Sequence, residues 1–550
     1  MAIVSTHVAR TLAQHVHEVF GLMGNGNAYF LDALLRETDA TFTAVRHEAG
    51  AVVAADAHFR TSGRIAAATT TYGAGFTNTL TALAEAAQAR IPLVLVVGDE
   101  PTSGPRPWDV DQIALSSAVG ARTYTVGRID AAAATVTAIE HALAYRVPVV
   151  LAIPYDVAQL DIGEVPTVPG PGSSAPLAPT ADFTRAAIRR LATDLSAAER
   201  PLLLAGRGAW LAGAGHALGE LAEATGALTA TTALGRGIFP EDHFDLGVAG
   251  GFGAPGAMAA VQDADVAVVV GADLNQFTMR FGELFHPETT VWQIDTAPAA
   301  THARVGGFVR ADARLGTEAV SSALVDQARP RAPWRESVDA PQLRTHAVGA
   351  ELAEDGRLDP RAAAARLAQL LPEDRVVVSD GGHFIAWANM YWPITDPHRM
   401  AMVGTAFQSI GLGWPSVPGA ARANPDSTVV LTSGDGGGAM ALADLESAVR
   451  SAGGRGIAVV WNDAAYGAEV NLYGLKGLVR EPMLIPEMDF AALGRAAGAE
   501  GVIVRRLEDL DRLRSWSLEA VEERSFLVLD LRISGTVIAP YQEEVIRVNS

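Results

Sequence analysis

The chain has 550 residues and a formal net charge of −20, and this acidic balance argues against nucleic acids and anionic membranes as partners. Hydrophobic residues make up 49% of the sequence, which is ample for large buried cores. The sequence contains no cysteine, so disulfides, thiolate nucleophiles and cysteine-ligated metals are excluded.

No apolar stretch approaches the roughly 20 residues that a membrane-spanning helix needs. The N-terminus also lacks the charged-then-apolar pattern of a signal peptide. Lys476 is the only lysine, and its glycine-flanked segment is a poor place for the desolvated amine of a Schiff-base mechanism. These features predict a cytoplasmic enzyme that acts on small molecules, without nucleic acid or membrane partners.

Residues 1–161 alternate helical patterns with short apolar strands, for example TFTAVRH and PLVLVVG. Short apolar strands separated by helices of about 10–15 residues predict a parallel sheet covered on both faces. Residues 162–181 are rich in Pro, Gly and Ser and have no apolar periodicity, which indicates a linker.

The same alternation returns twice further along the chain. Residues 182–328 contain the strand-like runs PLLLAG, VAVVVG and VWQID, and residues 350–550 contain RVVVSD, STVVLTS, IAVVWN and SFLVLDL. A polar, proline-containing stretch at 329–349 separates these two segments. The sequence therefore predicts an α/β protein with three doubly wound parallel-sheet domains: N-terminal, central and C-terminal.

Three landmarks in the N-terminal segment place polar groups at turns. The glycine turn GLMGNGN contains Asn25, and the run TTTYGAGFTN contains Gly73 and Asn78. Glu48 precedes residues 49–55, which are all Ala, Val or Gly. Such apolar surroundings suit a carboxyl that shares a proton with a ring nitrogen of a ligand. The alternative is a helix-start carboxylate that the helix dipole favours.

The central segment opens with RPLLLAGRGA, which partly looks like a dinucleotide glycine fingerprint. The glycine spacing does not fit G-x-G-x-x-G, and the acidic residue expected about 20 positions later is not convincing. A structural role for this domain is therefore favoured over dinucleotide binding.

The most informative motif is Gly434-Asp435-Gly436 after a β-branched run, with Asn462 following Asp435 by 27 positions at the end of the next strand. A carboxylate and an amide at the C-terminal ends of two parallel strands can share one hard cation. Gly436 and Gly437 let the backbone approach phosphate oxygens at a helix N-terminus. The motif predicts a site for a divalent metal and a diphosphate; the alternative is a helix N-cap and a turn residue.

Together these motifs resemble the thiamin-diphosphate enzymes of the acetolactate synthase and pyruvate decarboxylase superfamily. The GDG motif with its later Asn resembles the family's metal and diphosphate signature. The RHE-x-x-A segment around Glu48 and the glycine turn at 73–78 resemble two further family motifs, the second being GPG-x-x-N. The resemblance covers nearly the whole chain, and its landmarks fall in the right order.

The resemblance implies a pyrimidine-binding N-terminal domain and a diphosphate-binding C-terminal domain. Acetolactate synthases carry FAD in the central domain, so the resemblance makes FAD possible here, although the sequence of that domain does not support it. Mg²⁺ would be held by the side chains of Asp435 and Asn462 and by the main-chain carbonyl of Ala464. Contacts to the cofactor would come from the residues that match the family's motifs: Glu48, Gly73, Asn78, Asp380, Gly382, His383, Gln408, Ile410, Gly434, Gly436, Gly437, Tyr466 and Gly467.

The family pattern G-x-M-G-x-G-x-P carries a bulky apolar wedge under the cofactor. Its match here places Ile410 at the wedge, 25 positions before Asp435. Gln408 then falls at the position whose carbonyl accepts a hydrogen bond from the cofactor's amino group. The alternative for Ile410 is an ordinary core residue.

The resemblance also implies the reaction, in which Glu48 promotes the imino tautomer of the cofactor and a 2-oxo acid loses carbon dioxide. The remaining fragment would either be protonated and leave as an aldehyde or attack a second carbonyl compound. Ligation is favoured over simple decarboxylation because no clear set of proton donors is visible. A non-catalytic homologue that keeps the fold is the remaining alternative.

The chain departs from its relatives at the positions that decide the substrate. Trp108 falls where acetolactate synthases have the Gln of an F-Q-E motif, and Asn25 stands where pyruvate decarboxylases have an acidic residue. His383 and Phe384 replace a Gln-His pair. An amide cannot donate a proton with a tuned pKa as a carboxyl can. His383, Asn25 and Trp108 are therefore catalytic candidates beside Glu48 and Ile410, and neither family activity is secured.

Relatives form the active site between two chains, so the resemblance implies a homodimer or homotetramer. Glu48 of one chain would face Asp435 and Asn462 of the other. Residues 467–483 are rich in glycine and follow the metal-site strand. We expect this segment to be a mobile lid that cofactor or substrate orders.

Overall fold

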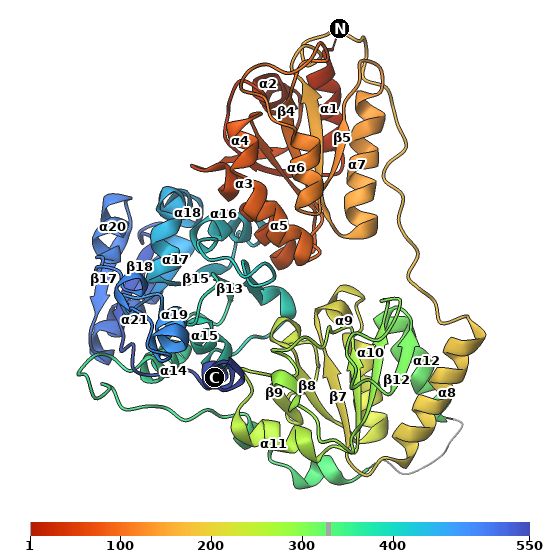
Figure 1. Ribbon diagram of the computed structural model, residues 1–550, viewed down its shortest axis with the longest axis vertical. Helices are drawn as coiled ribbons and strands as arrows, with labels where there is room; N and C mark the ends of the chain where they lie inside the picture. The colour runs from red at the N-terminus through yellow and green to blue at the C-terminus, as the bar shows by residue number, and fades with distance from the viewer. Residues whose placement is uncertain (1, 326–331, 550) are drawn as a thin grey trace.

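The computed structural model describes residues 2–325 and 332–549. Three six-stranded sheets follow one another along the chain, and helices flank each of them. Within the described residues the strand pairs of these sheets are all parallel. The three domains form a triangle in Figure 1, with the N-terminal domain at the top, the C-terminal domain at the left and the central domain below. The predicted α/β fold with three doubly wound sheets is confirmed.

The N-terminal sheet has the strand order β2-β1-β3-β4-β6-β5. Its central strands are buried along their whole length, as strands covered on both faces should be. Its elements are α1 (Val4–Ala13), β1 (Glu18–Gly21), α2 (Ala28–Glu37), β2 (Thr41–Ala44), α3 (Glu48–Ser62), β3 (Ala66–Thr70), α4 (Ala74–Thr77), α5 (Leu80–Gln88), β4 (Leu93–Asp99), α6 (Gln112–Ala118), β5 (Arg122–Thr125), α7 (Ala131–Tyr145) and β6 (Pro148–Pro154).

The central sheet has the order β12-β11-β10-β7-β8-β9. The buried runs PLLLA and VAVVV form its two middle strands. Its elements are α8 (Asp182–Ala197), β7 (Pro201–Ala205), α9 (Arg207–Leu211), α10 (Gly215–Thr225), β8 (Leu228–Thr231), β9 (Asp245–Val248), α11 (Pro255–Asp263), β10 (Val266–Val270), β11 (Thr290–Asp295), β12 (Gly307–Arg310) and α12 (Ala313–Val325).

The C-terminal sheet has the order β14-β13-β15-β16-β18-β17. Its elements are α14 (Pro360–Leu370), β13 (Arg375–Ser379), α15 (Ile385–Tyr391), β14 (Met400–Met402), α16 (Gly413–Ala423), β15 (Thr428–Gly434), α17 (Asp435–Met440), α18 (Leu445–Ala452), β16 (Gly456–Asn462), α19 (Gly467–Glu469), α20 (Phe490–Ala496), β17 (Glu500–Val504), α21 (Asp511–Leu518), β18 (Leu527–Arg532) and α22 (Pro540–Asn549).

The two expected linkers differ in structure. Residues 162–181 contain no helix or strand and run down the right-hand side of Figure 1 to α8. The stretch at 329–349 instead contains the short helices η3 (Trp334–Ser337) and α13 (Ala340–Leu343). Both helices start at Pro-containing turns, which local sequence periodicity cannot reveal. The expected boundary between 328 and 329 lies outside the described residues, and the domain boundaries stay predictions.

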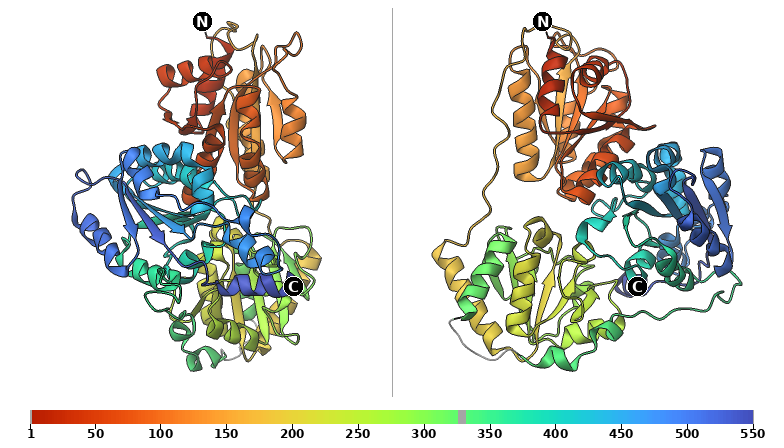
Figure 2. Two further views of the ribbon diagram at one scale, coloured as in Figure 1. Left: turned by 60° about the vertical axis from the view of Figure 1, so that its left-hand side comes forward. Right: turned by 180° about the vertical axis from the view of Figure 1, so that it is seen from behind.

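The N- and C-terminal domains of one chain pack together through α3 and α16. Gly419 approaches α3 so closely that a Cβ there would lie 1.9 Å from the carbonyl oxygen of Ala54. An ion pair of 2.9 Å joins Arg422 of α16 to Glu18 of β1. Both views in Figure 2 show these domains in contact, with the C-terminal helix beside the central domain. There Glu544 of α22 pairs with Arg280.

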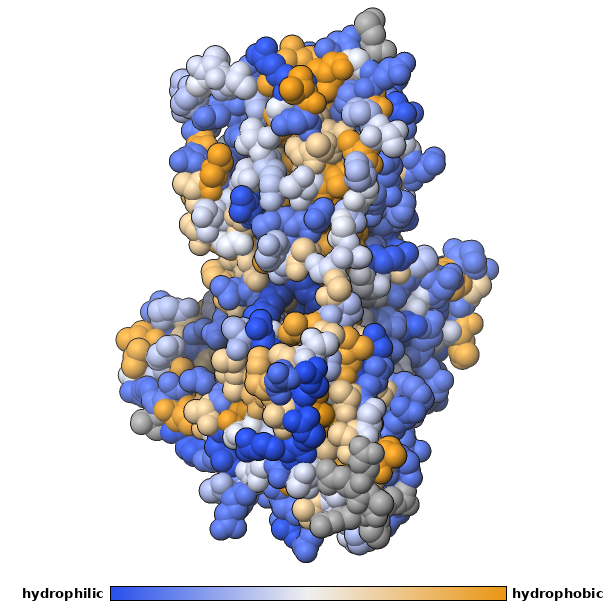
Figure 3. Space-filling model, turned by 90° about the vertical axis from the view of Figure 1, so that its right-hand side faces the viewer, coloured by the Kyte–Doolittle hydropathy of each residue, from blue (hydrophilic) through white to orange (hydrophobic). Residues whose placement is uncertain are grey.

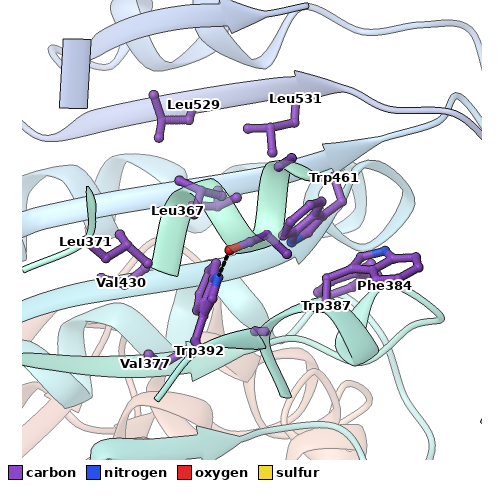
Figure 4. Close-up of a cluster of buried hydrophobic side chains, with 14 of the residues drawn as sticks. Leu367, Leu371, Val377, Phe384, Trp387, Trp392, Val430, Trp461, Leu529 and Leu531 are labelled. Carbon is purple, nitrogen blue, oxygen red and sulfur yellow. Dashed lines mark hydrogen bonds between the residues drawn. The ribbon is translucent and has the colours of Figure 1, made fainter. Parts of the chain in front are cut away.

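A tryptophan-rich core supports the C-terminal sheet, and it includes the enclosed rings of Trp387, Trp392 and Trp461 (Figure 4). Trp392 Nε1 donates to the carbonyl of Ala364 at 3.1 Å, and Trp461 Nε1 donates to Thr432 Oγ1 at 2.8 Å. Buried indoles usually find such a partner. The Trp461–Thr432 bond joins β16 to β15, and the polar residues of the next section stand at the ends of these two strands.

The N-terminal domain rises as a separate lobe above a narrower waist in Figure 3. The apolar residues on that face gather in several groups, and blue hydrophilic residues surround them. Across the part of the chain that the structure describes, no helix is both long and apolar enough to cross a membrane.

Candidate active site

Asp435 and Asn462 lie at the C-terminal edge of the third sheet. β15 ends at Gly434 and α17 begins at Asp435, while the neighbouring strand β16 ends at Asn462. The two strands are paired in parallel with Gly434 opposite Trp461, so the next residues emerge at the same edge. Both side chains are buried, Asp435 at 3% and Asn462 at 0% exposure.

Each of these side chains keeps one oxygen without a partner. Asn462 Nδ2 donates to the carbonyl of Met488 at 3.0 Å and to Asp530 Oδ1 at 2.9 Å. Asp435 Oδ1 accepts from the backbone N–H of Gly436 at 3.0 Å. Asn462 Oδ1 and Asp435 Oδ2 are buried and accept no hydrogen bond from any described residue. A buried acceptor without a hydrogen bond costs about 1–3 kcal/mol. These two oxygens therefore fit the binding of a cation, which would satisfy both of them.

The charges around the pair also fit a cation. Burial, reinforced by the neighbouring Asp463, raises the pKa of Asp435 to about 7. Burial opposes a charge on His383, but its 3.2 Å contact with Asp463 and the nearby Asp435 outweigh burial and raise the pKa of His383. Without a bound cation the site thus has more carboxylates than positive charges, and bound protons or a metal ion would balance this excess.

The donor set suits a metal that keeps ligands from outside the protein. Within residues 2–325 and 332–549, no three acidic or histidine side chains gather as a metal cluster. One carboxylate, one amide and the carbonyl of Ala464 would leave room for phosphate oxygens and water, as Mg²⁺ prefers. Ala464 adopts a left-handed φ of 60°, and its carbonyl accepts from Ile485 N at 3.0 Å. A carbonyl oxygen has a second lone pair for a metal.

Glycines let three other predicted residues come close to this edge. A Cβ at Gly467 would lie 2.3 Å from the His383 ring, and one at Gly436 would lie 2.7 Å from the Tyr466 ring. The structure therefore brings His383, Tyr466, Gly436 and Gly467 together around the start of α17. Gly382 has a φ of 132°, which allows the turn that precedes His383.

Asp380 lies beneath a loop rather than at the open edge. Its carboxylate accepts from the backbone N–H groups of Gly381, Gly411 and Leu412 at 2.8, 3.2 and 3.1 Å. Ser433 Oγ donates to it at 3.2 Å. The side chain is fully buried, and burial raises its pKa to about 6. Asp380 thus braces the turn around Ile410, and its predicted contact to the cofactor stays a prediction.

We call residues 404–411 the wedge loop. Ser409 N donates to the carbonyl of Gly404 at 2.8 Å and closes the loop on itself. Gln408 has a left-handed φ of 57° and is exposed, as is Phe407 at 48%. Ile410 is half-buried. The loop presents these side chains next to the glycine turn of β13, because a Cβ at Gly381 would lie 3.4 Å from Ile410 Cγ2.

A second polar group forms in the N-terminal domain around Glu48, the first residue of α3. Asn78 Nδ2 donates to Glu48 Oε2 at 2.9 Å, and a Cβ at Gly75 would lie 3.4 Å from Glu48 Oε1. Gly73 N donates to Gln112 Oε1 at 3.1 Å. The fold thus brings together Glu48, Gly73 and Asn78. The position of Glu48 at the start of α3 agrees both with a carboxyl that shares a proton with a ligand and with a helix-start carboxylate.

Asn25 and Trp108 lie at the rim of the same domain. Asn25 Nδ2 donates to Tyr72 Oη at 2.8 Å. The Arg106 guanidinium lies 4.2 Å from the centre of the Tyr72 ring and 5.6 Å from that of Trp108. Trp108 is 61% exposed.

Sequence reasoning missed several residues that complete these groups. Asp463 follows Asn462 directly, which was a visible signal for a second carboxylate. Asp530 stands alone inside the apolar run of β18, and an isolated acid in a buried strand is a second signal. The sequence carried no signal for Gln112, Arg106 and Tyr72, because only the fold brings them beside the glycine turn.

The central domain gives no support for a bound FAD. The N–H groups of Gly206 and Gly208 at its glycine turn donate to the carbonyls of Val270 and Gly271 at 2.9 and 2.8 Å. A Cβ at Gly206 would also lie 2.5 Å from Ala272 Cβ. Amides that are already paired do not cradle a diphosphate.

Comparison with known protein families matches all three domains in order. Residues 3–115 match the thiamine pyrophosphate enzyme N-terminal TPP binding domain, 188–320 the central domain and 380–531 the C-terminal TPP binding domain. The chain belongs to the thiamine pyrophosphate enzyme family. Thiamine pyrophosphate is another name for the thiamin diphosphate that the motifs predict, and the family's two binding domains contain the two polar groups described above.

Curated members of the thiamine pyrophosphate enzyme family resemble the whole chain. The acetolactate synthase isozyme 3 large subunit of Escherichia coli (strain K12) is 28% identical over 96% of this chain and 94% of that protein. The acetolactate synthase large subunit of Parasynechococcus marenigrum (strain WH8102) is 30% identical over 90% and 82%. The crystal structure of benzoylformate decarboxylase from Polynucleobacter necessarius has a TM-score of 0.80 and 22% identity, covering 98% of this chain and 99% of that one.

Proposed function

We propose that this chain is a thiamin-diphosphate- and Mg²⁺-dependent enzyme that decarboxylates a 2-oxo acid and joins the remaining carbon fragment to a second carbonyl compound. The observation that carries the proposal is the pair of unpartnered buried oxygens, Asp435 Oδ2 and Asn462 Oδ1. They stand where the diphosphate end of the cofactor would reach the glycine turn of α17. A cytoplasmic location stays a prediction from the sequence.

The chain's own residues have distinct parts in this proposal. Asp435, Asn462 and the Ala464 carbonyl would hold Mg²⁺, and the N–H groups at the start of α17 would face phosphate oxygens. Glu48, oriented by its hydrogen bond from Asn78, would exchange a proton with the pyrimidine end of the cofactor. When bound, thiamin diphosphate supplies the electron sink that decarboxylation needs. Ile410 would support the bent form of the cofactor from below.

We further propose that each active site forms between two chains of a homodimer or homotetramer. Large apolar side chains are exposed in segments close in sequence to the candidate site residues: Trp108 at 61%, Phe407 at 48%, Met440 at 61%, Leu478 at 52% and Val479 at 73%. Exposed apolar residues of this size favour burial against a second copy. In that arrangement Glu48 of one chain would face Asp435 and Asn462 of the other.

The first experiment measures carbon dioxide release from a panel of 2-oxo acids with thiamin diphosphate and Mg²⁺, for the unmodified chain and for Glu48→Gln. Release from one acid, with a rate that falls by about 10²–10⁴ in the variant, is the expected result for a lost proton-transfer group. Product analysis then separates a ligated ketol from an aldehyde. No release from any acid would contradict the proposal.

The second experiment tests the shared site by mixing two inactive variants. Glu48→Gln and Asp435→Ala chains, co-expressed with different affinity tags, should regain about a quarter of normal activity, because half of the dimers are mixed and each mixed dimer has one intact site. If both residues served a site within one chain, mixing would restore nothing.

Simple decarboxylation that releases an aldehyde is the second candidate. Asn25 favours ligation over this candidate, because its amide is held by Tyr72 and offers no titrating proton near the reacting fragment. A non-catalytic homologue is the third candidate. The presence of Glu48 weighs against it, as do Asp435 and Asn462, because a protein released from catalysis has no need of the buried, unpartnered oxygens of the latter two.

A further inference from the structure

The wedge loop is held from outside its own domain. Glu85 on α5 of the N-terminal domain accepts hydrogen bonds from two successive backbone N–H groups of the loop. Phe407 N donates to Glu85 Oε2 at 2.7 Å, and Ala406 N donates to Oε1 at 3.4 Å. The carboxylate is only 1% exposed. A side chain of the N-terminal domain therefore fixes the backbone immediately before Gln408.

Arg60 on α3 ties Glu85 into a buried cluster. Its Nη2 donates to Glu85 Oε1 at 2.9 Å and its Nη1 to the carbonyl of Met402, just before the wedge loop, at 2.7 Å. Asp56 on the same helix also pairs with Arg60. The side chains of Arg60 and Glu85 are 4% and 1% exposed. Hydrogen bonds to buried charges are about twice as strong as neutral ones, so this clamp is stiff.

A fourth charge comes from the central domain. Arg207 at the start of α9 donates to the carbonyl of Ala89 at 2.9 Å and is close enough to interact electrostatically with Asp56 and Glu85. Two carboxylates and two guanidinium groups make the cluster neutral overall, which limits the cost of burying them. All three domains of one chain thus meet at this cluster, next to the wedge loop.

The wedge loop depends on such support because it makes few bonds of its own. Gly404 and Gly411 have φ values of 100° and 84°, and Gln408 stands in the left-handed region at 57°. A non-glycine residue in that region costs free energy and persists only where its surroundings hold it. Asp380 holds the C-terminal end of the loop through Gly411 N, and Glu85 holds its middle through Phe407 N.

We infer that Glu85 is a positioning residue for the cofactor site, through which the N-terminal domain of a chain sets the backbone of that chain's own wedge loop. This inference rests on the proposed function. Each N-terminal domain then has two separate tasks: Glu48 serves the site shared with the partner chain, and Glu85 shapes the wedge loop of its own chain. Glu85 acts through the carbonyl of Gln408 and the side chain of Ile410, without contact to the cofactor.

Glu85→Gln tests the inference, because a single amide oxygen cannot serve both Arg60 and Phe407 N. Glu18→Gln is the matched control: it breaks another ion pair between the same two domains, with Arg422, but leaves the wedge loop alone. Thiamin diphosphate affinity with Mg²⁺ is measured by tryptophan fluorescence quenching. The near-ultraviolet circular dichroism of the bound cofactor and the melting temperature are recorded alongside.

We expect Glu85→Gln to lower the melting temperature more than Glu18→Gln, because Arg60 and Glu85 are buried whereas Arg422 is 39% exposed. Only Glu85→Gln should weaken cofactor binding, by about tenfold or more, as the loss of a charged hydrogen bond predicts, and only it should change the cofactor's dichroism. If Glu85→Gln does not fold, Glu85→Asp replaces it: it keeps the charge for Arg60 but is too short for the loop, so it should show the same cofactor defect.

Each outcome separates the two proposals. Equal cofactor affinity and dichroism in the Glu85 variants and in Glu18→Gln would overturn the positioning role and leave the proposed function standing. If the unmodified chain binds no thiamin diphosphate, both proposals fall.

Discussion

Asn462 donates a 2.9 Å hydrogen bond from Nδ2 to Oδ1 of Asp530, a carboxylate that is fully buried. Asp530 is itself held, because its Oδ2 accepts from Phe490 N and from Arg532. The bond therefore fixes which end of the Asn462 amide points away from Asp530, and the end that does so is the unpartnered oxygen. A residue outside the candidate metal ligands thus orients one of them.

Asp530→Asn should weaken Mg²⁺ binding without removing a ligand. The new amide places an N–H₂ group against Asn462 or against Phe490 N, so the Asn462 side chain no longer has one preferred orientation. Loss of such an outer partner typically costs about 10–100-fold in metal affinity. The Mg²⁺ concentration for half-maximal cofactor binding measures it. Asp489→Asn, at the nearby N-terminus of α20, is the control, and equal Mg²⁺ requirements would contradict the prediction.

Gly467→Ala should disturb the His383–Asp463 contact. The added Cβ would lie 2.3 Å from the imidazole ring, and the backbone of His383 is held in place because Tyr541 Oη donates to its carbonyl at 2.9 Å. Overpacking of this kind costs about 1–3 kcal/mol, so cofactor affinity in calorimetric titration should fall about tenfold. Gly535→Ala is the matched control, since its Cβ would have an ordinary 3.7 Å contact with Asp463. If Gly467→Ala and Gly535→Ala bind the cofactor with the same affinity, the prediction is wrong.

His58 should make the stability of the chain depend on pH. It lies on α3 beneath α16, where burial lowers its pKa from 6.5 to about 4. The folded chain therefore excludes a proton that the unfolded chain binds between these two values, so stability falls as the pH drops from 6.5 towards 4. The contribution is about 3 kcal/mol at the lower end, from 1.36 kcal/mol per pKa unit.

The change in urea midpoint between pH 6.5 and 4.5 checks this contribution. The loss should be smaller in His58→Gln than in the unmodified chain, whereas the exposed His17→Gln should lose as much as the unmodified chain. A loss of the same size in all three proteins would show that other groups cause it.

Trp108→Ala should act on substrate more than on cofactor. Trp108 is 61% exposed in the single chain. Its backbone carbonyl oxygen would lie 2.9 Å from a Cβ added at Gly73. Truncating an anchoring aromatic at an interface costs more than about 1 kcal/mol, so KM for the 2-oxo acid should rise about fivefold or more. Cofactor affinity should stay within about twofold in the same assays. Ile129→Ala, 95% exposed, is the control. A changed cofactor affinity with an unchanged KM would contradict the prediction.

The sequence by itself determined the fold class and the main landmarks of the site. β-branched runs such as VAVVV and TVVLTS become buried parallel strands because both faces of such a sheet need apolar residues. Asp435 and Asn462 could be expected at one sheet edge because residues that end neighbouring parallel strands emerge together. Two edge strands escaped, because β5 has no buried residue and β14, although apolar, is only three residues long.

Only the tertiary structure decided which groups support these landmarks. Glu85 lies 322 positions from Phe407, and Asn462 lies 68 from Asp530, so no local pattern relates either pair. Such contacts depend on how α3 packs on α16 and on the order of strands in the third sheet. Motif residues are recognisable because their chemistry constrains a short stretch of chain. The residues that hold them in place can come from any element that the fold brings near.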